Sequence, residues 1–168
     1  ASASVRTDAA QDDVTSTGAV VISTTAGSLT TLTGTGDISA SGHMLLSAGG
    51  STSDLTLGGT LSNAAGHTSM VAGRSIAQNA NITASAAGLG VELQATAGAV
   101  TLADGTAVQT NRGNVRVSAA GDITVGVIDA RASDDRSTPG LSLQTHGTTP
   151  WGSVSLISSA GSILDNGS

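Results

Sequence analysis

The sequence predicts an all-β fold, a right-handed parallel β-helix with about 24 residues and three short strands per coil. Short segments of alternating apolar residues recur at a nearly constant interval, and Gly and other small residues separate them. Only 1% of the 168 residues are aromatic, with one Trp and neither Phe nor Tyr. A stack of narrow coils needs no large side chains in its core. We therefore expect one domain of about six coils over residues 1–168.

The clearest repeat is a pair of apolar positions two residues apart, as on one face of a strand. The six pairs are Val20/Ile22, Met44/Leu46, Thr68/Met70, Val91/Leu93, Val115/Val117 and Val154/Leu156. Their first members are separated by 24, 24, 23, 24 and 39 residues, and their second members give the same series. A fixed period of this length is typical of a solenoid in which equivalent residues stack.

Two further apolar positions complete each coil. Downstream of the pairs, after corners that contain Gly, lie Leu29, Leu55/Leu57, Ile76, Val100, Ile123 and Ile163. Upstream of the pairs lie Val14, Ile38, Leu61, Ile82 and Val108. Segments this short, alternating with period 2 and containing β-branched residues, indicate strands, and Gly suits corners that need positive φ or close backbone approach. An antiparallel sandwich would need bulky residues to fill a layer about 10 Å thick.

One interval departs from the repeat. Between Val115 and Val154 lie 39 residues where about 24 are expected, so fifteen are extra. We place them in an inserted loop or hairpin near 129–151, because insertions in solenoids leave the stack on one face. This stretch holds both prolines and the single Trp. The candidate recognition residues in it are Asp134, Asp135, Arg136, His146 and Trp151.

Composition and charge exclude several functional classes. The chain has six Lys and Arg against twelve Asp and Glu, a net charge of −6, so it lacks the basic surface that nucleic-acid binding needs. The absence of Cys excludes a disulfide scaffold and a Cys-based zinc module. No apolar run approaches the roughly 20 residues of a membrane-spanning helix, and the first residues show no signal-peptide pattern. Regularly spaced Val, Ile and Leu argue against disorder.

Three segments carry a resemblance to a known family. They are GAVVISTTAGSLTTL (18–32), GNVRVSAAGDITV (113–125) and GSVSLISSAGSILDNGS (152–168). Their shared pattern, Gly-x-Φ-x-Φ followed by small residues and Gly-[Asp/Ser/Ala]-Φ with Φ apolar, resembles the β-helix repeats of filamentous haemagglutinin-like adhesins and other giant bacterial surface proteins. The resemblance covers roughly residues 14–165. It implies export by a Gram-negative cell, a surface or extracellular location and a scaffold or adhesion role, and it supplies no catalytic residues.

Metal sites have weak candidates. Residues 49–54, GGSTSD, approach a calcium-binding nonapeptide but lack its fourth-position Gly, and we expect a plain turn there. The acid pairs Asp12-Asp13 and Asp134-Asp135 offer hard oxygen ligands, although adjacent acids in loops are usually solvated. His43 and His67 lie one repeat apart, and we expect a stacked surface pair more than a metal site. No cofactor is expected, with Ca²⁺ as the minor alternative.

A carbohydrate-active β-helix enzyme, a polysaccharide lyase or hydrolase, is the alternative function. Such enzymes need clustered carboxylates beside a groove, and paired carboxylates roughly 5–9.5 Å apart serve glycoside hydrolysis. Here Asp37, Asp104 and Asp122 occupy separate corners, Glu92 is alone on its strand, and a sugar-stacking groove would have only Trp151. We expect Trp151 to close the excursion against the stack, and we expect no enzymatic activity.

Water ordering by a flat threonine array is a further possible function. Translating Thr31, Thr33 and Thr35 by one repeat gives Leu55, Leu57 and Gly59, so no Thr ladder is expected.

The ends of the coil stack show no cap in the sequence. Neither chain end shows a capping helix or a charged cap, although uncovered terminal coils expose unpaired backbone groups. The interpretation is continuation into a longer solenoid or end-to-end self-association, with residues 1–13 available to pair with a neighbour.

The sequence thus predicts a structural and adhesive segment of an exported bacterial surface protein or extracellular filament. Its role would be a rigid scaffold that displays the excursion near 129–151 to an unidentified ligand on a host cell, another cell or the matrix. Nucleic acid and membrane insertion are not expected among its interactions.

Overall fold

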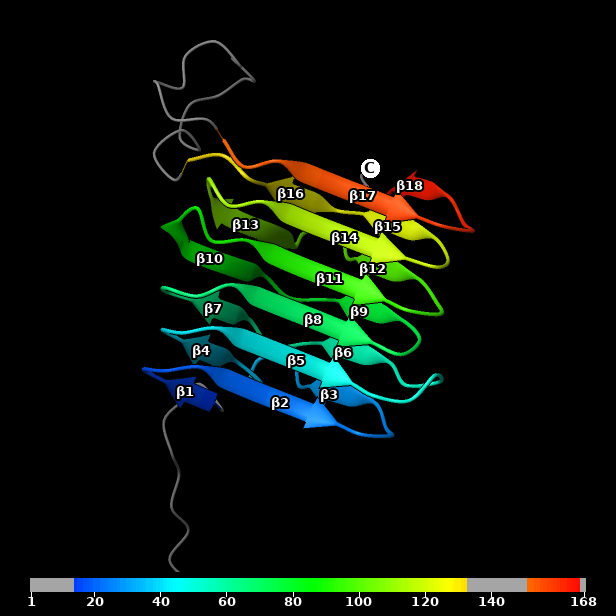
Figure 1. Ribbon diagram of the computed structural model, residues 1–168, viewed down its shortest axis with the longest axis horizontal. Coiled ribbons are helices and arrows are strands. Elements are labelled where there is room, and N and C mark those ends of the chain that lie inside the picture. The colour runs from blue at the N-terminus through cyan, green and yellow to red at the C-terminus, as the bar shows by residue number, and fades with distance from the viewer. Residues whose placement is uncertain (1–13, 133–150, 167–168) are drawn as a thin grey trace, which may run out of the picture.

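A computed structural model describes residues 14–132 and 151–166. These residues form a parallel β-solenoid in which three sheets of six strands run along the stack (Figure 1). Each coil contributes one strand to each sheet, as the prediction of three short strands per coil requires. Coils of about 24 residues are confirmed, while the right-handed turn of the coil stays a prediction.

The sheets are named A, B and C in the order in which the chain enters them. Sheet A comprises β1 (Val14–Ser16), β4 (Ile38–Ala40), β7 (Leu61–Asn63), β10 (Ile82–Ala87), β13 (Ala107–Asn111) and β16 (Val127–Asp129). Sheet B comprises β2 (Val20–Thr24), β5 (Met44–Ala48), β8 (Thr68–Ala72), β11 (Val91–Ala95), β14 (Val115–Ala119) and β17 (Val154–Ser158). Sheet C comprises β3 (Leu29–Thr31), β6 (Leu55–Leu57), β9 (Ile76–Gln78), β12 (Val100–Leu102), β15 (Ile123–Val125) and β18 (Ile163–Asp165).

The strand register confirms the repeat read from the sequence. Val91 pairs with Thr68 on one side and with Val115 on the other, so residues 23 and 24 positions apart stack directly. Val115 in turn pairs with Val154, although 39 residues separate them. The long interval is therefore absorbed between β16 and β17, and the ladder of sheet B continues across it.

The core consists of aliphatic ladders that run through the stack. In sheet B the inward position passes through Leu46, Met70, Leu93 and Val117, all fully buried. Full burial of one such side chain contributes roughly 1.5–3 kcal/mol. Because each ladder places one medium-sized side chain per coil about 4.8 Å from the next, no aromatic ring is needed to fill the interior.

Two kinds of glycine shape the corners. Gly50 has a φ of +95°, a conformation that residues with a Cβ rarely adopt. Gly66 has an ordinary φ, but a Cβ on it would collide with the carbonyl oxygen of Gly42 on the preceding coil. Both reasons expected from the sequence therefore occur, at different corners.

A few interior positions are polar, and turn geometry explains them. Asn63 stands on an inward ladder of sheet A between Ala40 and Ala84 and is only 1% exposed. Its Oδ1 accepts the backbone N–H groups of Ala65 and Gly66 at 3.2 and 2.8 Å. The side chain thus satisfies the turn between β7 and β8 from inside the coil, which removes the cost of burying it.

Candidate functional site

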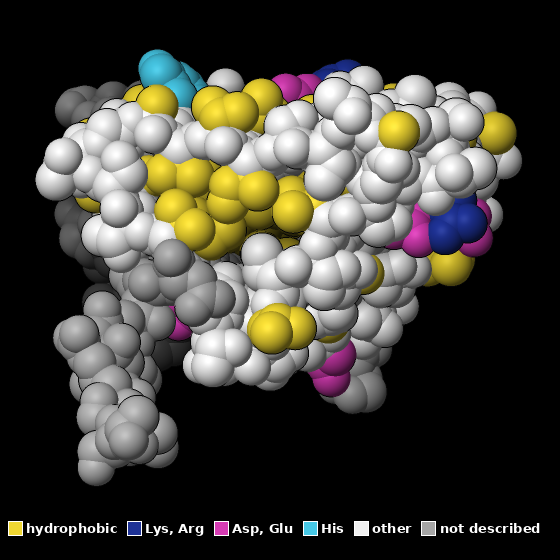
Figure 2. All heavy atoms as spheres, turned by 90° about the horizontal axis from the view of Figure 1, so that it is seen from below, with side chains coloured by type: hydrophobic (Ala, Val, Ile, Leu, Met, Phe, Trp, Pro, Cys, Tyr) yellow, Lys and Arg dark blue, Asp and Glu magenta, His cyan; other side chains and the backbone are white. Residues whose placement is uncertain are grey.

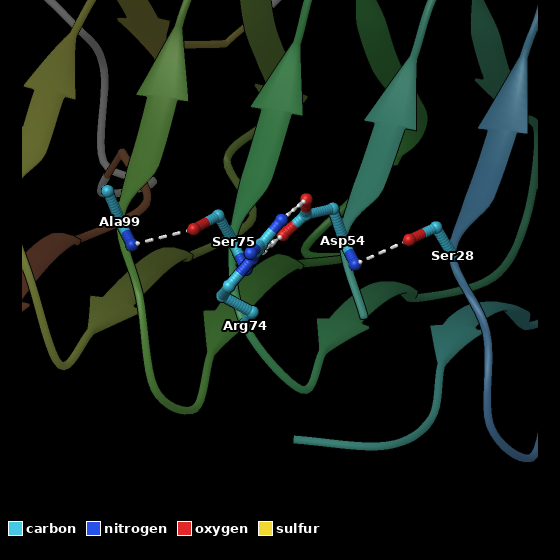
Figure 3. Close-up of polar contacts among 5 residues, drawn as sticks. All are labelled: Ser28, Asp54, Arg74, Ser75 and Ala99. Atoms are coloured by element: carbon cyan, nitrogen blue, oxygen red, sulfur yellow. Dashed lines mark hydrogen bonds and ion pairs between the residues drawn. The ribbon is translucent and has the colours of Figure 1, made fainter. Parts of the chain in front are cut away.

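The corners before the strands carry a ladder of side-chain acceptors, which Figure 3 shows for sheet C. Ser28 Oγ accepts the backbone N–H of Asp54 at 3.0 Å, Asp54 Oδ1 accepts that of Ser75 at 3.1 Å, and Ser75 Oγ accepts that of Ala99 at 3.2 Å. Each acceptor lies one residue before its strand. The backbone N–H it satisfies belongs to the equivalent residue of the next coil.

The same arrangement recurs at the other two corners. At the corners before sheet A, Asp37 accepts the backbone N–H of Thr60, and Asn81 accepts that of Ala107. At the corners before sheet B, His43 accepts the backbone N–H of His67, and His67 accepts that of Gly90. Asn114 accepts the backbone N–H of Ser153 in the same way. We call these residues the corner acceptors: Ser28, Asp37, His43, Asp54, His67, Ser75, Asn81, Asn114 and Asp122. The Asp or Ser of the repeated Gly-[Asp/Ser/Ala]-Φ pattern is the sequence signal of this position.

Asp54 has a second role on the surface. Its carboxylate forms an ion pair with Arg74, whose Nε donates to Asp54 Oδ1 at 2.7 Å. The hydrogen bond from Arg74 lowers the pKa of Asp54, an effect that burial partly opposes and that the N–H of Ser75 reinforces. The preceding residues form the predicted turn, in which the Ser53 N–H donates to the Gly50 carbonyl at 3.0 Å. The carboxylate of the GGSTSD segment is therefore engaged by protein groups.

The two repeat-spaced histidines stack on the surface, as predicted. The His43 and His67 rings are 5.6 Å apart between centroids and only 6° from parallel. The Nδ1 of each ring accepts a backbone N–H, from His67 at 3.2 Å and from Gly90 at 2.9 Å. A neutral ring that accepts at Nδ1 carries its proton on Nε2, so neither nitrogen presents a lone pair to a metal. No group of three or more potential metal ligands occurs within residues 14–132 and 151–166.

The surface acid on sheet B has a partner on the next coil. Glu92 pairs in register with Arg116, and the two side chains form an ion pair. Glu92 is alone on its own strand, as expected, and its partner lies on the neighbouring strand β14. The signal that would have revealed the pair was present, because Arg116 follows Glu92 by one 24-residue repeat.

The beginning and end of the predicted excursion are described. Asp129 lies in β16, and its carboxylate accepts from Arg131 Nε and Nη2 at 2.9 and 2.8 Å. Ala130 and Ala132 are buried, so packing on the stack extends further into the predicted excursion than expected. Asp134, Asp135, Arg136 and His146 lie outside the described residues, as do Asp12 and Asp13.

Trp151 stands where the chain returns to the stack. It is partly buried. It lines an open hollow of about 560 Å³ together with Val127, Ile128, Val154 and the Asp129–Arg131 pair. The hollow thus joins an aromatic ring, aliphatic side chains and a charged pair at the base of the excursion. Of the predicted recognition residues, Trp151 is the one whose surroundings the structure describes.

No uninterrupted Thr ladder runs through sheet C, as expected, although a partial column of threonines does. The outward position of sheet C passes in register through Thr30, Thr56, Ala77, Thr101 and Thr124. Thr31 is an inward position, and Thr33 and Thr35 lie beyond β3, so none of the three belongs to this column. A three-residue strand presents one outward side chain, so this face carries a single interrupted column of hydroxyls.

Comparison of the chain with protein-family models, curated proteins and solved structures gave no match. Within the described ranges, no helix is long and apolar enough to cross a membrane.

Proposed function

We propose that this chain is a rigid scaffold segment of an exported bacterial surface protein or extracellular filament, of the filamentous haemagglutinin-like kind. Its location would be the cell surface or the extracellular space. The stack of coils sets distance, and the excursion near 129–151 is the element that meets a ligand on a host cell, another cell or the matrix. The repeat pattern of the three quoted segments supports the family assignment within this proposal.

One observation carries the proposal. The ladder of sheet B passes from Val115 to Val154 without a change of register, and Asp122 accepts the N–H of Ser162 on the far side of the inserted residues. The stack therefore tolerates extra residues at this point without losing its intercoil bonds. A scaffold that displays a loop requires this separation between the regular body and the inserted residues.

The charged side chains favour a scaffold over the alternative carbohydrate-active enzyme. Asp37, Asp54 and Asp122 are corner acceptors, and Glu92 forms an ion pair with Arg116. Each of these four carboxylates is therefore engaged in a contact between successive coils.

Binding to cells tests the display role. We would replace residues 133–147 by a short Gly-Ser linker, which keeps the Asp129–Arg131 pair, Ala132 and Trp151 in place. Adhesion of labelled chain to cultured epithelial cells should be lost, while far-ultraviolet circular dichroism stays that of the β-solenoid. Thr101→Ala on the outer face of sheet C is the matched surface control and should bind like the parent chain. Unchanged adhesion of the loop-deleted chain would overturn the display role.

A further inference from the structure

The last coil exposes side chains whose ladder neighbours on the preceding coil are buried. Ile163 is 50% exposed although its ladder neighbour Ile123 is fully buried. Val154 is 47% exposed although its neighbour Val115 is 1% exposed. These positions face the interior, so their exposure reflects the open end of the stack. A further coil placed on β17 and β18 would bury them as Ile123 and Val115 are buried.

The opposite end of the stack is open in the same way. Figure 2 looks onto this end and shows apolar side chains gathered across the cross-section of the molecule. Three inward residues of the first coil, Val14, Ile22 and Leu29, are only partly buried, whereas a fourth, Val20, is 5% exposed. Both ends thus present aliphatic side chains at equivalent positions of the repeat, although Val20 of the first coil is more deeply buried than Val154 of the last.

The strand edges at the two ends lack the usual protection against pairing. β1, β2 and β3 at one end and β16, β17 and β18 at the other are the outermost strands of their sheets (Figure 1). Natural edge strands are commonly blocked by charged residues or Pro. Residues 14–31 contain neither, whereas at the other end β16 contains Asp129, which is paired with Arg131, and β18 contains Asp165. These edges are therefore suited to accept another strand.

The corner acceptors give the stack a direction. In each intercoil pair the acceptor side chain belongs to the earlier coil and the N–H to the later one, as for Asn114 and Ser153 or Asp122 and Ser162. On the last coil the acceptor positions are held by Ser153 and Ser162, whose side chains carry an acceptor oxygen. On the first coil the corresponding N–H groups belong to Ala19 and Ser28.

We infer that a second copy of this chain stacks head to tail, with its first coil on the last coil of its neighbour. Ser153 and Ser162 then meet the N–H groups of Ala19 and Ser28, and the three sheets continue in register. The contact joins two different surfaces and does not close, so repeated stacking produces a filament. This inference rests on the proposed scaffold function and specifies its partner and polarity.

Blocking the last coil tests the contact. Val154→Lys places a charge on the inward position of β17, whereas Ile157→Lys places it on the outward position of the same strand at nearly equal exposure, 46%. Sedimentation velocity over a concentration series should show the parent chain and Ile157→Lys in growing oligomers. Val154→Lys should sediment as a monomer of 16.1 kDa. A parent chain that stays strictly monomeric at the highest concentration overturns the inference.

Mixing two blocked variants tests the polarity. Leu29→Lys blocks the first coil, with Val14→Lys as a second variant of the same end if Leu29→Lys fails to fold. Alone, each blocked variant should be monomeric. An equimolar mixture with Val154→Lys should form one-to-one heterodimers, because each component keeps the end that the other lacks. Homodimers of either variant alone would show head-to-head or tail-to-tail contact and would overturn head-to-tail stacking.

The two failures are distinguishable. A monomeric parent chain with intact β circular dichroism and loop-dependent cell adhesion contradicts stacking and leaves the scaffold function in place. Adhesion that stays the same when residues 133–147 are replaced contradicts the display role, whether or not oligomers form.

Discussion

The carboxylate of Asp122 accepts the backbone N–H of Ser162 at 2.7 Å, although forty residues of chain separate them. The contact repeats, across the inserted residues, the bond that Asp54 makes to Ser75 between uninterrupted coils. A corner bond of this kind ties a surface side chain to an otherwise unpaired donor on the next coil. The bond therefore helps to fix which residues of successive coils lie opposite each other.

Replacing Asp122 tests the corner acceptors. Asp122→Ala removes the acceptor of the Ser162 N–H and should lower the free energy of unfolding by about 0.5–1.5 kcal/mol. Asp122→Asn keeps an acceptor oxygen and should stay near the parent value. Urea denaturation measures the loss, and amide hydrogen exchange at Ser162 should accelerate in Asp122→Ala alone. Equal exchange in both variants would contradict the assigned role.

Replacing Gly66 tests the close approach of successive coils. Gly66→Ala drives a Cβ into the carbonyl oxygen of Gly42, and the backbone must shift to accommodate it. Overpacking of this kind should cost about 1–3 kcal/mol. Gly27→Ala is the matched control, because a Cβ there meets nothing within 4 Å. Thermal denaturation of both variants checks the difference, and equal melting temperatures would refute the steric argument.

Removing Arg74 tests the electrostatics of the corner. The hydrogen bond from Arg74 lowers the pKa of Asp54 in the folded chain, so between the folded and unfolded pKa values the unfolded state binds more protons. The stabilisation is therefore present above the ordinary pKa of Asp and is lost as pH falls through the lowered value. In Arg74→Met the carboxyl titration of Asp54, followed by NMR, should move upward. An unchanged titration would show that Arg74 does not set this pKa.

Zinc addition tests the tautomer of the stacked histidines. Both Nδ1 atoms accept backbone N–H groups, so zinc would have to displace an intercoil bond or the Nε2 proton. The melting temperature of the parent chain should stay unchanged on adding zinc. His43→Ala with His67→Ala should melt lower with or without the metal, because two intercoil bonds are lost. A zinc-dependent rise in the parent chain alone would identify a metal site.

Much of the fold could be predicted because identical roles repeat at fixed spacing. The pairs Val91/Leu93 and Val115/Val117 have the predicted register, and the 39-residue interval up to Val154 lies between the predicted neighbours. Even the irregular coil at Leu55/Leu57 takes its place in sheet C. Inward positions can be recognised in the sequence because burial requires apolar residues there.

The surface and the turns could be predicted less well. Asn63 is polar at an inward position because it satisfies a turn, so it breaks the apolar pattern that defines the ladder. The partial column through Thr30 and Thr56 was missed because these paired residues lie 26 positions apart, so a translation by 24 residues does not bring them together. The Glu92–Arg116 pair depends on which coil lies beside which, and this becomes readable only once the register is known.

Distances along the stack test the scaffold most directly. Because the chain has no Cys, Thr30→Cys and Thr124→Cys give two unique positions for spin labels, four coil steps apart on the outer face of sheet C. At about 4.8 Å a step the two backbone sites lie about 19 Å apart. Pulsed electron paramagnetic resonance should give one narrow distance near this value, identical with and without residues 133–147. A broad distribution, or a distance that changes when the loop is removed, would contradict a rigid stack that carries the loop as an independent element.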